Sequence, residues 1–336
     1  MARRSSWAVP FRSSPCSRSR PVGPMNPPGS VRVSPRQRLL RASPSPMPDD
    51  SDPTIPASAL RRLTGLEPFP QPELIPIRTP VVLMHGFGVG ASFRRGGHLH
   101  KEALHLRSRG VRAVAPNVSP YNTVRARTAT WNDRLRRVLD ETDADRLLLI
   151  AHSMGGLDAR YLISALGWHE VVDVLVTIAT PHRGSSVASL VLDQPELVRD
   201  WLADMADWVG THILEDGSAN LRQALTELTP EHMENTFNPE VPNHPDVDYW
   251  SYGCRAGKGT AIPIAPIFRY LNRYLYEEEG ENDGIVSVES ARWGDYQGTV
   301  DADHARQVGL SSGLAADFDS NAFYTSIVQN LADDGW

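Results

Sequence analysis

The sequence predicts an α/β protein with a mostly parallel central sheet flanked by helices. From about residue 61 onward, short apolar runs alternate with segments of helical periodicity, which is typical of parallel strands joined by covering helices. Most of these runs are continuously apolar, as strands buried on both faces are. The chain has 336 residues, 40% of them hydrophobic and 22% charged, so it can bury a sizeable core.

Six strands are expected along the chain. They lie at 81–84, 111–115, 147–151, 171–179, 249–253 and 297–300. Between the second and third strands, Trp131, Leu135 and Val138 recur at the spacing of one helix face. Further helices are expected at 157–166, directly after the third strand, and from about Ser320 onward. The pattern therefore predicts alternating strand and helix units.

Residues 186–246 interrupt this alternation, and we expect them to form an inserted helical cap. Val198, Leu202, Met205 and Val209 make one helical face within it. Such a face either packs on the domain as ordinary core or belongs to a lid whose apolar side covers a lipid-binding cleft. Because apolar helix faces are common, both interpretations stay open, and contact of the cap with a lipid interface follows only from the second.

Residues 1–60 are rich in Arg, Ser and Pro and show no helical or strand period, so we expect them to be disordered, ahead of a domain at 61–336. Residues 1–48 contain nine Arg and no Asp, Glu or Lys. This bias resembles an organelle transit peptide, but Pro is too frequent for an amphipathic presequence helix. We therefore favour a start site placed too early, with translation beginning at Met47.

Charge and hydropathy argue against several classes of function. The net charge of −6 disfavours general nucleic-acid binding. No apolar run reaches the roughly 18 residues that suggest a membrane-spanning helix, and residues 1–60 lack the apolar run of a secretory signal. Of the two cysteines, Cys16 and Cys254, only the second lies in the body of the chain, which favours a reducing compartment. We expect a cytoplasmic protein.

The strongest functional signal is the segment 151–156, which reads Ala-His-Ser-Met-Gly-Gly. It directly follows an apolar strand and directly precedes a helix, which is the context of the nucleophile elbow of the α/β-hydrolase fold. The tight turn needs small residues two before and two after the serine. Gly155 provides one, and Ala151 replaces the usual Gly at the other. A serine that merely caps the helix is the alternative, but motif and context agree, so we expect Ser153 to be the nucleophile.

His304 and Asp283 are the expected base and acid. The fold places its catalytic residues in the order Ser, acid, His, and His304 alone among the histidines follows the last expected strand. Asp283 begins an Asp-Gly turn after the fifth strand, where the fold places its acid. Three other carboxylates are fallbacks, namely Asp295, Asp301 and Asp303. His152 adjoins Ser153, but neighbours at a sharp turn project in different directions, so we expect it to have a packing role.

The oxyanion of an acyl-transfer intermediate needs two donors, and we expect them to be the backbone N–H groups of Met154 and Phe87. Met154 directly follows the nucleophile, and Phe87 lies in the Gly-rich loop 85–90 after the first strand. A phosphate-binding loop is the alternative for 85–90, but the third-glycine spacing and the Lys-Ser/Thr ending are missing. His85 and His182 are expected to tether loops.

At these residues the chain resembles the bacterial triacylglycerol lipases of the Pseudomonas and Burkholderia type. The matching segments are 80–88, 118–125, 151–161, 176–185 and 282–286, within a likeness that covers roughly 78–330. The resemblance implies the α/β-hydrolase fold, carboxylic-ester substrates and a mobile cap. It also implies the triad of Ser153, Asp283 and His304, with Phe87 and Met154 as oxyanion donors.

Two departures from that family bear on metals and location. The family commonly holds a structural calcium through an Asp two residues after the catalytic His, and this chain has Arg306 there. Because a hard cation needs oxygen ligands, we expect no metal at that position and no cofactor elsewhere. The family is usually secreted, often with a disulfide, whereas Cys254 has no partner in the body of the chain. An intracellular enzyme on small or membrane-derived esters is therefore expected.

The same catalytic residues suit other reactions. A thioesterase, a phospholipase or an acyltransferase uses the same nucleophile chemistry. The alternative outside enzymes is a catalytically inactive hydrolase fold that serves as a binding module. Ser, Asp and His in the expected order favour an active enzyme over that alternative.

Overall fold

The computed structural model describes residues 61–62, 64–66, 71–87, 99–119, 121–194, 218–310 and 318–336. The chain divides into two units, residues 1–69 and 70–336. In the described part of the first unit, the Leu66 N–H donates to the Arg61 carbonyl across a short turn. The expected disorder of residues 1–60, the start at Met47 and the helical face at 198–209 lie outside the described residues.

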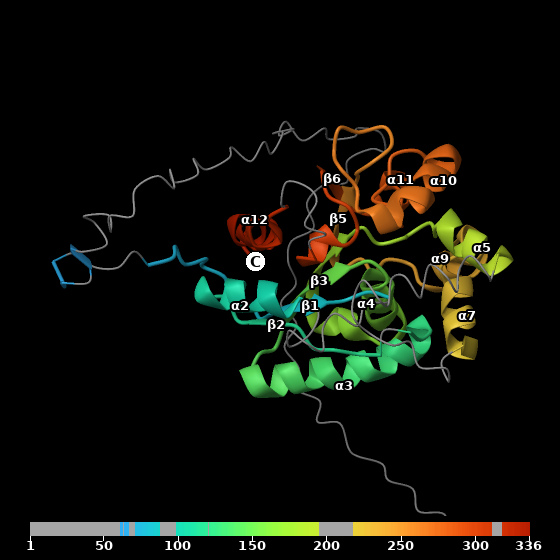
Figure 1. The fold of residues 1–336 in the computed structure, drawn as a ribbon. Helices are drawn as coiled ribbons and strands as arrows, with labels where there is room; N and C mark the ends of the chain where they lie inside the picture. The colour runs from blue at the N-terminus through green and yellow to red at the C-terminus, as the bar shows by residue number, and fades with distance from the viewer. Residues whose placement is uncertain are drawn as a thin grey trace, which may run out of the picture. The chain divides into compact units, whose positions relative to one another are not determined.

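A six-stranded sheet forms the centre of the second unit (Figure 1). Its strands are β1 (Val81–Met84), β2 (Ala113–Val114), β3 (Leu147–His152), β4 (Val172–Ile178), β5 (Asp248–Cys254) and β6 (Asp295–Val300). Their order is β2-β1-β3-β4-β5-β6, and every neighbouring pair is parallel. The six expected strands are therefore present, although the edge strand β2 keeps only two residues of the expected 111–115.

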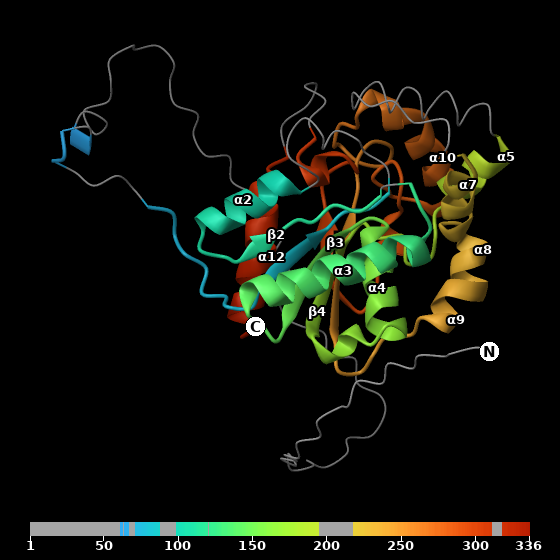
Figure 2. The ribbon, with the colours of Figure 1, turned by 90° about the horizontal axis from the view of Figure 1, so that it is seen from below.

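Helices cover both faces of this sheet (Figure 2). Among the described helices, those on its two faces include α2 (His100–Ser108), α3 (Val124–Thr142), α4 (Gly155–Ala165) and α12 (Ser320–Asp333). Successive strand residues point to opposite faces, so Leu83 packs with α2 and α12, whereas Val82 packs with α3 and α4. Strands buried in this way on both faces must be apolar throughout, which explains the continuous runs in the sequence.

The order of the strands decides where a site can form. β1 lies between β2 and β3, so the chain leaves β1 toward one side of the sheet and later returns to its other side. The carboxyl ends of strands that flank such a reversal open a crevice where ligands bind. The loop after β1, which begins at His85, and the turn after β3, which begins at Ser153, therefore meet at one edge of the sheet.

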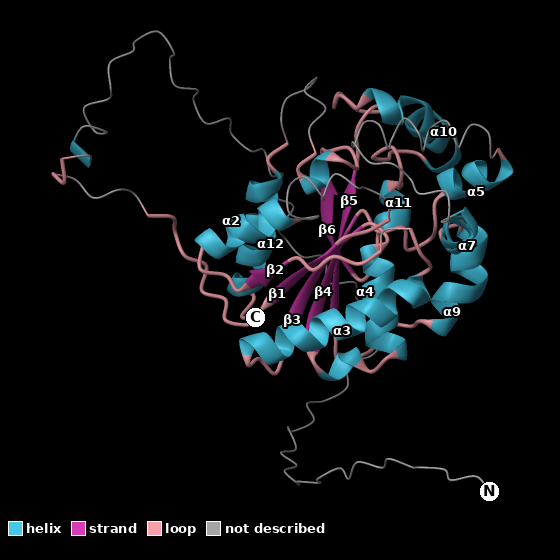
Figure 3. Cartoon of the chain, turned by 60° about the horizontal axis from the view of Figure 1, so that its bottom comes forward, coloured by secondary structure: helices cyan, strands magenta, loops and turns pink. Residues whose placement is uncertain are grey.

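The described part of 186–246 is largely helical and lies beside the sheet (Figure 3). It contains α5 (Ser186–Asp193), α7 (Ser218–Glu227), α8 (Pro230–His232), a π-helical turn (Met233–Phe237) and α9 (Asn238–Glu240). Its apolar side chains, Ala188 and Phe237 among them, pack with Met154 and Leu157 at the start of α4. Two further helices follow β5, namely α10 (Arg269–Glu279) and α11 (Val288–Ala291). The insertion thus borders the turn after β3.

A buried guanidinium attaches the insertion to α4. Arg160 donates to Oδ1 of Asn238 at 2.9 Å and to the Val241 carbonyl at 2.8 Å. Its guanidinium carbon lies 3.9 Å from the ring centroid of Trp293, in the segment before β6. Burial lowers the pKa of Arg160 to about 9, because the charged form loses hydration. One side chain therefore links α4, the insertion and the segment before β6.

Leu104 and Leu106 provide a matched test of the core, because both lie on α2. Leu106 is fully buried against the sheet, whereas Leu104 is 48% exposed. We expect Leu106→Ala to lower the free energy of unfolding by about 2–5 kcal/mol, since it leaves a cavity. Leu104→Ala should change it by less than about 0.5 kcal/mol. Urea denaturation measures both, and equal losses would contradict this assignment of the buried face.

Candidate active site

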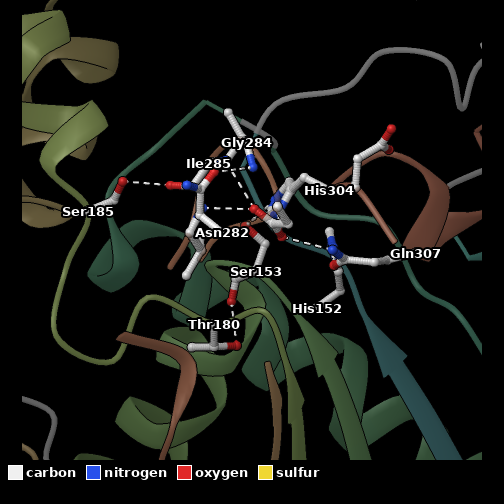
Figure 4. A network of polar contacts seen from close by, with 12 residues as sticks. His152, Ser153, Thr180, Ser185, Asn282, Gly284, Ile285, His304 and Gln307 are labelled. Atoms are coloured by element: carbon white, nitrogen blue, oxygen red, sulfur yellow. Dashed lines mark hydrogen bonds and ion pairs between the residues drawn. The ribbon is translucent and has the colours of Figure 1, made fainter. Parts of the chain in front are cut away.

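Ser153 lies in a strained turn between β3 and α4. Its φ is 56°, in the left-handed region that residues other than glycine seldom adopt. Two hydrogen bonds hold this conformation: the Ser153 N–H donates to the Ile178 carbonyl at 2.9 Å, and Oγ1 of Thr180 donates to the Ser153 carbonyl at 2.8 Å (Figure 4). Such strain persists only where the surroundings fix it, and it is common at catalytic sites.

The two small residues near Ser153, at positions 151 and 155, are required to different degrees. A Cβ on Gly155 would lie 2.8 Å from the carbonyl oxygens of Met84 and of His85, so position 155 has no room for a side chain. Ala151, by contrast, lies within β3, between Met84 of β1 and Thr177 of β4. Its methyl group packs in the core below the turn. The alanine at 151 is therefore accommodated without disturbing the turn.

The structure brings Ser153, His304 and Asp283 together from three separate segments of the chain. Oγ of Ser153 lies 3.0 Å from Nε2 of His304, and Nδ1 of His304 lies 2.7 Å from Oδ2 of Asp283. The His304 backbone N–H also donates to the Asp283 carbonyl at 3.0 Å. The imidazole is thus held by its own backbone and by the carboxylate, with its second nitrogen directed at the hydroxyl.

Asp283 is fully buried, and N–H groups compensate for its lost hydration. Oδ1 accepts the backbone N–H of Ile285 at 3.0 Å and that of Val286 at 2.8 Å. Asn282 supports the turn, because its Oδ1 accepts the Gly284 N–H at 2.9 Å. Buried carboxylates need such donors, since an unpaired charge in the interior is costly. The expected Asn-Asp-Gly turn is therefore what presents the carboxylate.

The three fallback carboxylates have other partners. Asp295 accepts from Gln297 at 2.8 Å, Asp301 pairs with Arg255 at 2.9 Å, and Asp303 pairs with Arg306 at 3.3 Å. Among these four carboxylates, Asp283 is the one that contacts His304.

The loop after β1 passes directly over the elbow. A Cβ on Gly86 would lie 2.5 Å from Cβ of Ser153 and 3.0 Å from the backbone nitrogen of Met154. Only glycine permits so close an approach of the two backbones. Phe87 follows Gly86 and packs in the same apolar cluster as Met154. The two expected oxyanion donors therefore lie in adjoining segments next to the Ser153 side chain. Gly88 to Gly90 of the Gly-rich loop lie outside the described residues.

A buried ion pair positions this loop. Nε of Arg127, on α3, donates to Oδ2 of Asp158, on α4, at 2.8 Å, and Trp131 donates to the same oxygen at 3.0 Å. Nη2 of Arg127 donates to the His85 carbonyl at 2.7 Å. Burial raises the pKa of Asp158, and the charge of Arg127 acts against this rise. The pair fixes the loop after β1 relative to the helix that carries the elbow.

His85 fixes the peptide that precedes the Phe87 nitrogen. Its Nε2 accepts the Val118 N–H at 3.1 Å, so Nδ1 carries the proton and donates to the Gly86 carbonyl at 3.0 Å. In a trans peptide the C=O and the N–H point in opposite directions. By holding the Gly86 carbonyl, His85 therefore also sets the direction of the Phe87 N–H.

Comparison with known proteins identifies the family. Triacylglycerol lipase 2 of Saccharomyces cerevisiae is 32% identical over 238 residues, which span 68% of this chain and 67% of the yeast protein. The chain belongs to the lipase-like α/β-hydrolases. The family model of palmitoyl protein thioesterases also matches residues 80–224. These findings confirm the expected fold family and the expected enzyme class, a hydrolase of carboxylic esters.

Bacterial relatives and solved structures extend this likeness. A triacylglycerol lipase of Burkholderia plantarii is 32% identical over 120 residues, covering 34% of this hydrolase and 33% of the relative. The crystal structure of a mature Bacillus licheniformis lipase has a TM-score of 0.53 at 23% identity, over 70% of this chain and 89% of that one. A metagenomic carboxyl esterase has a TM-score of 0.63 at 17% identity, over 80% of each chain. At these identities the two structures show the shared fold.

The position at which the resemblance would place a calcium ion does not fit a cation in this hydrolase. Nε of Arg306 lies 3.3 Å from Oδ2 of the buried Asp303. The Asp303 carboxylate also accepts the backbone N–H groups of Ala265 and Arg306, each at 3.0 Å. Burial raises the pKa of Asp303, while these N–H groups and the guanidinium act against it. Both carboxylate oxygens thus accept hydrogen bonds from N–H groups and lie beside the positive charge of Arg306. We therefore still expect no calcium there.

Several residues of this hydrolase's site were not identified from the sequence. Gln307 contacts Asp283, Thr180 holds the elbow, and Arg127 with Asp158 positions the loop after β1. A charged residue on the apolar face of a helix is a signal that could have found Arg127, four residues before Trp131. His152 is buried as expected, but its Nε2 also lies 2.9 Å from Oε1 of Gln307.

Gly86→Ala tests the close approach of the loop to the elbow. Its methyl group would collide with the Ser153 side chain, and the loop must retreat. We expect kcat/KM for ester hydrolysis to fall about 100-fold, since small misplacements of a reacting group have effects of that size. Gly167→Ala is the control, because it strains the backbone, at a φ of 75°, but its methyl group meets open space. It should lower only the Tm, and equal losses of activity would refute the role of Gly86.

Proposed function

We propose that this chain is a serine hydrolase that cleaves lipid carboxylic esters through an acyl-enzyme on Ser153. The observation that carries the proposal is the continuous hydrogen-bonded series from Oγ of Ser153 through the His304 imidazole to the Asp283 carboxylate. A serine hydroxyl is a weak nucleophile until a base accepts its proton. The series supplies that base and an acid that orients it, at the carboxyl edge of the sheet.

In the proposed acylation step, Oγ of Ser153 attacks the ester carbonyl carbon while Nε2 of His304 takes the hydroxyl proton. Asp283 accepts the Nδ1–H, keeps the imidazole in this tautomer and stabilises the imidazolium. The carbonyl oxygen gains a negative charge, which the N–H groups of Phe87 and Met154 stabilise. The bond to the alcohol oxygen then breaks, and His304 returns its proton to the leaving alcohol.

Deacylation repeats these roles with water. His304 takes a proton from a water molecule, whose oxygen attacks the acyl carbon of the enzyme ester. The same two N–H groups hold the oxyanion, and collapse of the intermediate breaks the bond to Oγ. His304 then returns the proton to Ser153, and the free carboxylic acid leaves. Every proton thus passes through one nitrogen of one imidazole, so no metal or cofactor is required.

The insertion supports a lipid substrate. Its apolar residues, Met233 and Phe237 among them, pack against Met154 and Phe87. An acyl chain attached to the reacting carbonyl would therefore meet apolar side chains from the insertion. The named lipase relatives are consistent with this substrate class. We propose that the insertion acts as a cap over the acyl chain and makes transient contact with a lipid interface.

Location is a separate part of the proposal. Among the helices of the described residues, none combines the length and the apolarity needed to cross a bilayer. Cys254 is buried and has a free thiol. Burial, with the negative charge of Asp283 nearby, raises the pKa of this thiol well above its usual value, so it is inert. A body with this single thiol supports the proposed cytoplasmic location.

Ser153→Ala tests the proposed nucleophile. We expect kcat for a p-nitrophenyl ester to fall by a factor on the order of 10⁶, because the serine and the histidine act as one unit. A fluorophosphonate probe should label the wild-type chain at Ser153 and leave this variant unlabelled. Ser164→Ala, on the same helix α4, is the matched control and should keep both labelling and turnover. Hydrolysis that survives in Ser153→Ala would end the proposal.

Thioester hydrolysis is the second candidate, because the palmitoyl protein thioesterase family model matches residues 80–224. Acylation of Ser153 is the same step for either substrate, and only the leaving group differs. We expect kcat/KM for a palmitoyl oxygen ester to exceed that for the matched palmitoyl thioester, and Ser153→Ala to abolish both. Turnover of the thioester alone would replace the ester in the proposal without changing the catalytic residues.

A further inference from the structure

A buried side-chain pair lies beside the proposed triad. Gln307 is fully buried in the 3-10 turn Arg306–Val308, which begins two residues after His304. Its Nε2 donates to Oδ2 of Asp283 at 2.8 Å, and its Oε1 lies 2.9 Å from Nε2 of His152 (Figure 4). We propose that Gln307 and His152 are positioning residues. They hold the Asp283 carboxylate and the His304 imidazole in the orientation that keeps the imidazole within hydrogen-bond distance of the Ser153 hydroxyl. This inference rests on the proposed function.

The directions of these hydrogen bonds fix the amide and the tautomer. An ionised carboxylate only accepts hydrogen bonds, so the amide nitrogen of Gln307 must face Asp283. Its carbonyl oxygen then faces His152, which must donate from Nε2. A flipped amide would place two acceptors together at Oδ2. The His152 N–H therefore selects the one orientation of Gln307 that supports the carboxylate.

Gln307 acts on the carboxylate oxygen that orients the catalytic base. Oδ2 of Asp283 accepts hydrogen bonds from Nδ1 of His304 at 2.7 Å and from Nε2 of Gln307 at 2.8 Å. Oδ1 accepts hydrogen bonds from two backbone N–H groups. With donors on both oxygens, the carboxylate cannot rotate without breaking a hydrogen bond. Because Gln307 lies three residues after His304, the turn that carries the base also carries this support.

His152 links this support to the nucleophile. It is the last residue of β3 and directly precedes Ser153. Its ring centroid lies 4.7 Å from that of His304, with an angle of 44° between the planes. Four hydrogen bonds therefore run from Ser153 through His304, Asp283 and Gln307 to His152, and one peptide bond closes the ring. A closed ring limits how far the base can drift from the hydroxyl.

Gln307→Leu removes the amide at similar volume and tests the proposal directly. We expect kcat to fall about 10- to 100-fold, because the His304 imidazole is then less well oriented toward the Ser153 hydroxyl. KM should stay the same, because Gln307 is not proposed to contact substrate. The acid limb of the pH profile of kcat/KM should move to higher pH. The reason is that the lost N–H stabilised the negatively charged acid–base pair more than its neutral, protonated form.

His152→Phe separates the two members of the pair. It keeps a ring beside His304 but removes the donor that orients Gln307. We therefore expect kcat to fall less than in Gln307→Leu, and the acid limb of kcat/KM to move to higher pH as well. The double variant should be no slower than Gln307→Leu alone, since both act through one hydrogen-bonded unit. Independent, additive losses would overturn the pair. Among the described residues, Asp303 and Cys254 interact electrostatically with Asp283, and Arg306 pairs with Asp303; all three are unchanged in every variant.

His182→Phe is the control for a merely structural effect. His182 is fully buried and stacks on Trp293, and its Nε2 contacts Oγ1 of Thr177. Its loss should lower the Tm without moving the acid limb.

If Gln307→Leu does not fold, Gln307→Glu is the second variant. It keeps the shape and replaces the donor by a second carboxylate, which should lower kcat and move the acid limb to still higher pH.

The outcomes separate this inference from the proposed function. A wild-type chain that the fluorophosphonate probe does not label at Ser153 would remove the proposed function, and the positioning pair with it. A wild-type chain that is labelled and active, beside a Gln307→Leu variant with unchanged kcat and an unmoved acid limb, would overturn the positioning pair alone.

Discussion

The left-handed backbone at Ser153 is the constraint on which the rest of the site depends. It directs the hydroxyl out of the carboxyl end of β3, and the surrounding structure bears the strain: Ile178 and Thr180 hold the peptide units on either side of Cα. The same sharp turn lets the loop at Gly86 approach so closely that no side chain fits there. The candidate oxyanion donors and the nucleophile thus result from one backbone conformation, set at the point where the strand order reverses.

Buried charges position the segments around this turn. Asp283, Asp158 and Asp303 are fully buried, and each accepts N–H donors from a segment distant in the chain or from its own turn, although for Asp158 these donors all reach Oδ2. Burying an unpaired charge is costly, so displacing any of these segments would leave a carboxylate without donors. These ion pairs and hydrogen bonds therefore act mainly by fixing the arrangement of the segments that they join, rather than by adding stability.

The insertion serves both packing and the proposed substrate site. Its apolar residues complete the core over the start of α4, and Arg160 of α4 donates hydrogen bonds to Asn238 and Val241 of the insertion. The described helices pack as core, and the face they present toward Phe87 and Met154 is where an acyl chain would lie in the proposed function.

The sequence by itself determined the sheet, the elbow and the order of the candidate residues, because burial and backbone preference are written in local patterns. Continuous apolar runs mark strands with two covered faces, and a small-residue turn between a strand and a helix marks Ser153. The tertiary structure alone decided the partners of the buried polar groups outside the expected Asp283–His304 pair. His152 and Gln307 meet across a separation of 155 residues, and Arg127 reaches His85 across 42. No local pattern encodes such contacts, because they form only once the strand order has brought separate turns to one edge of the sheet.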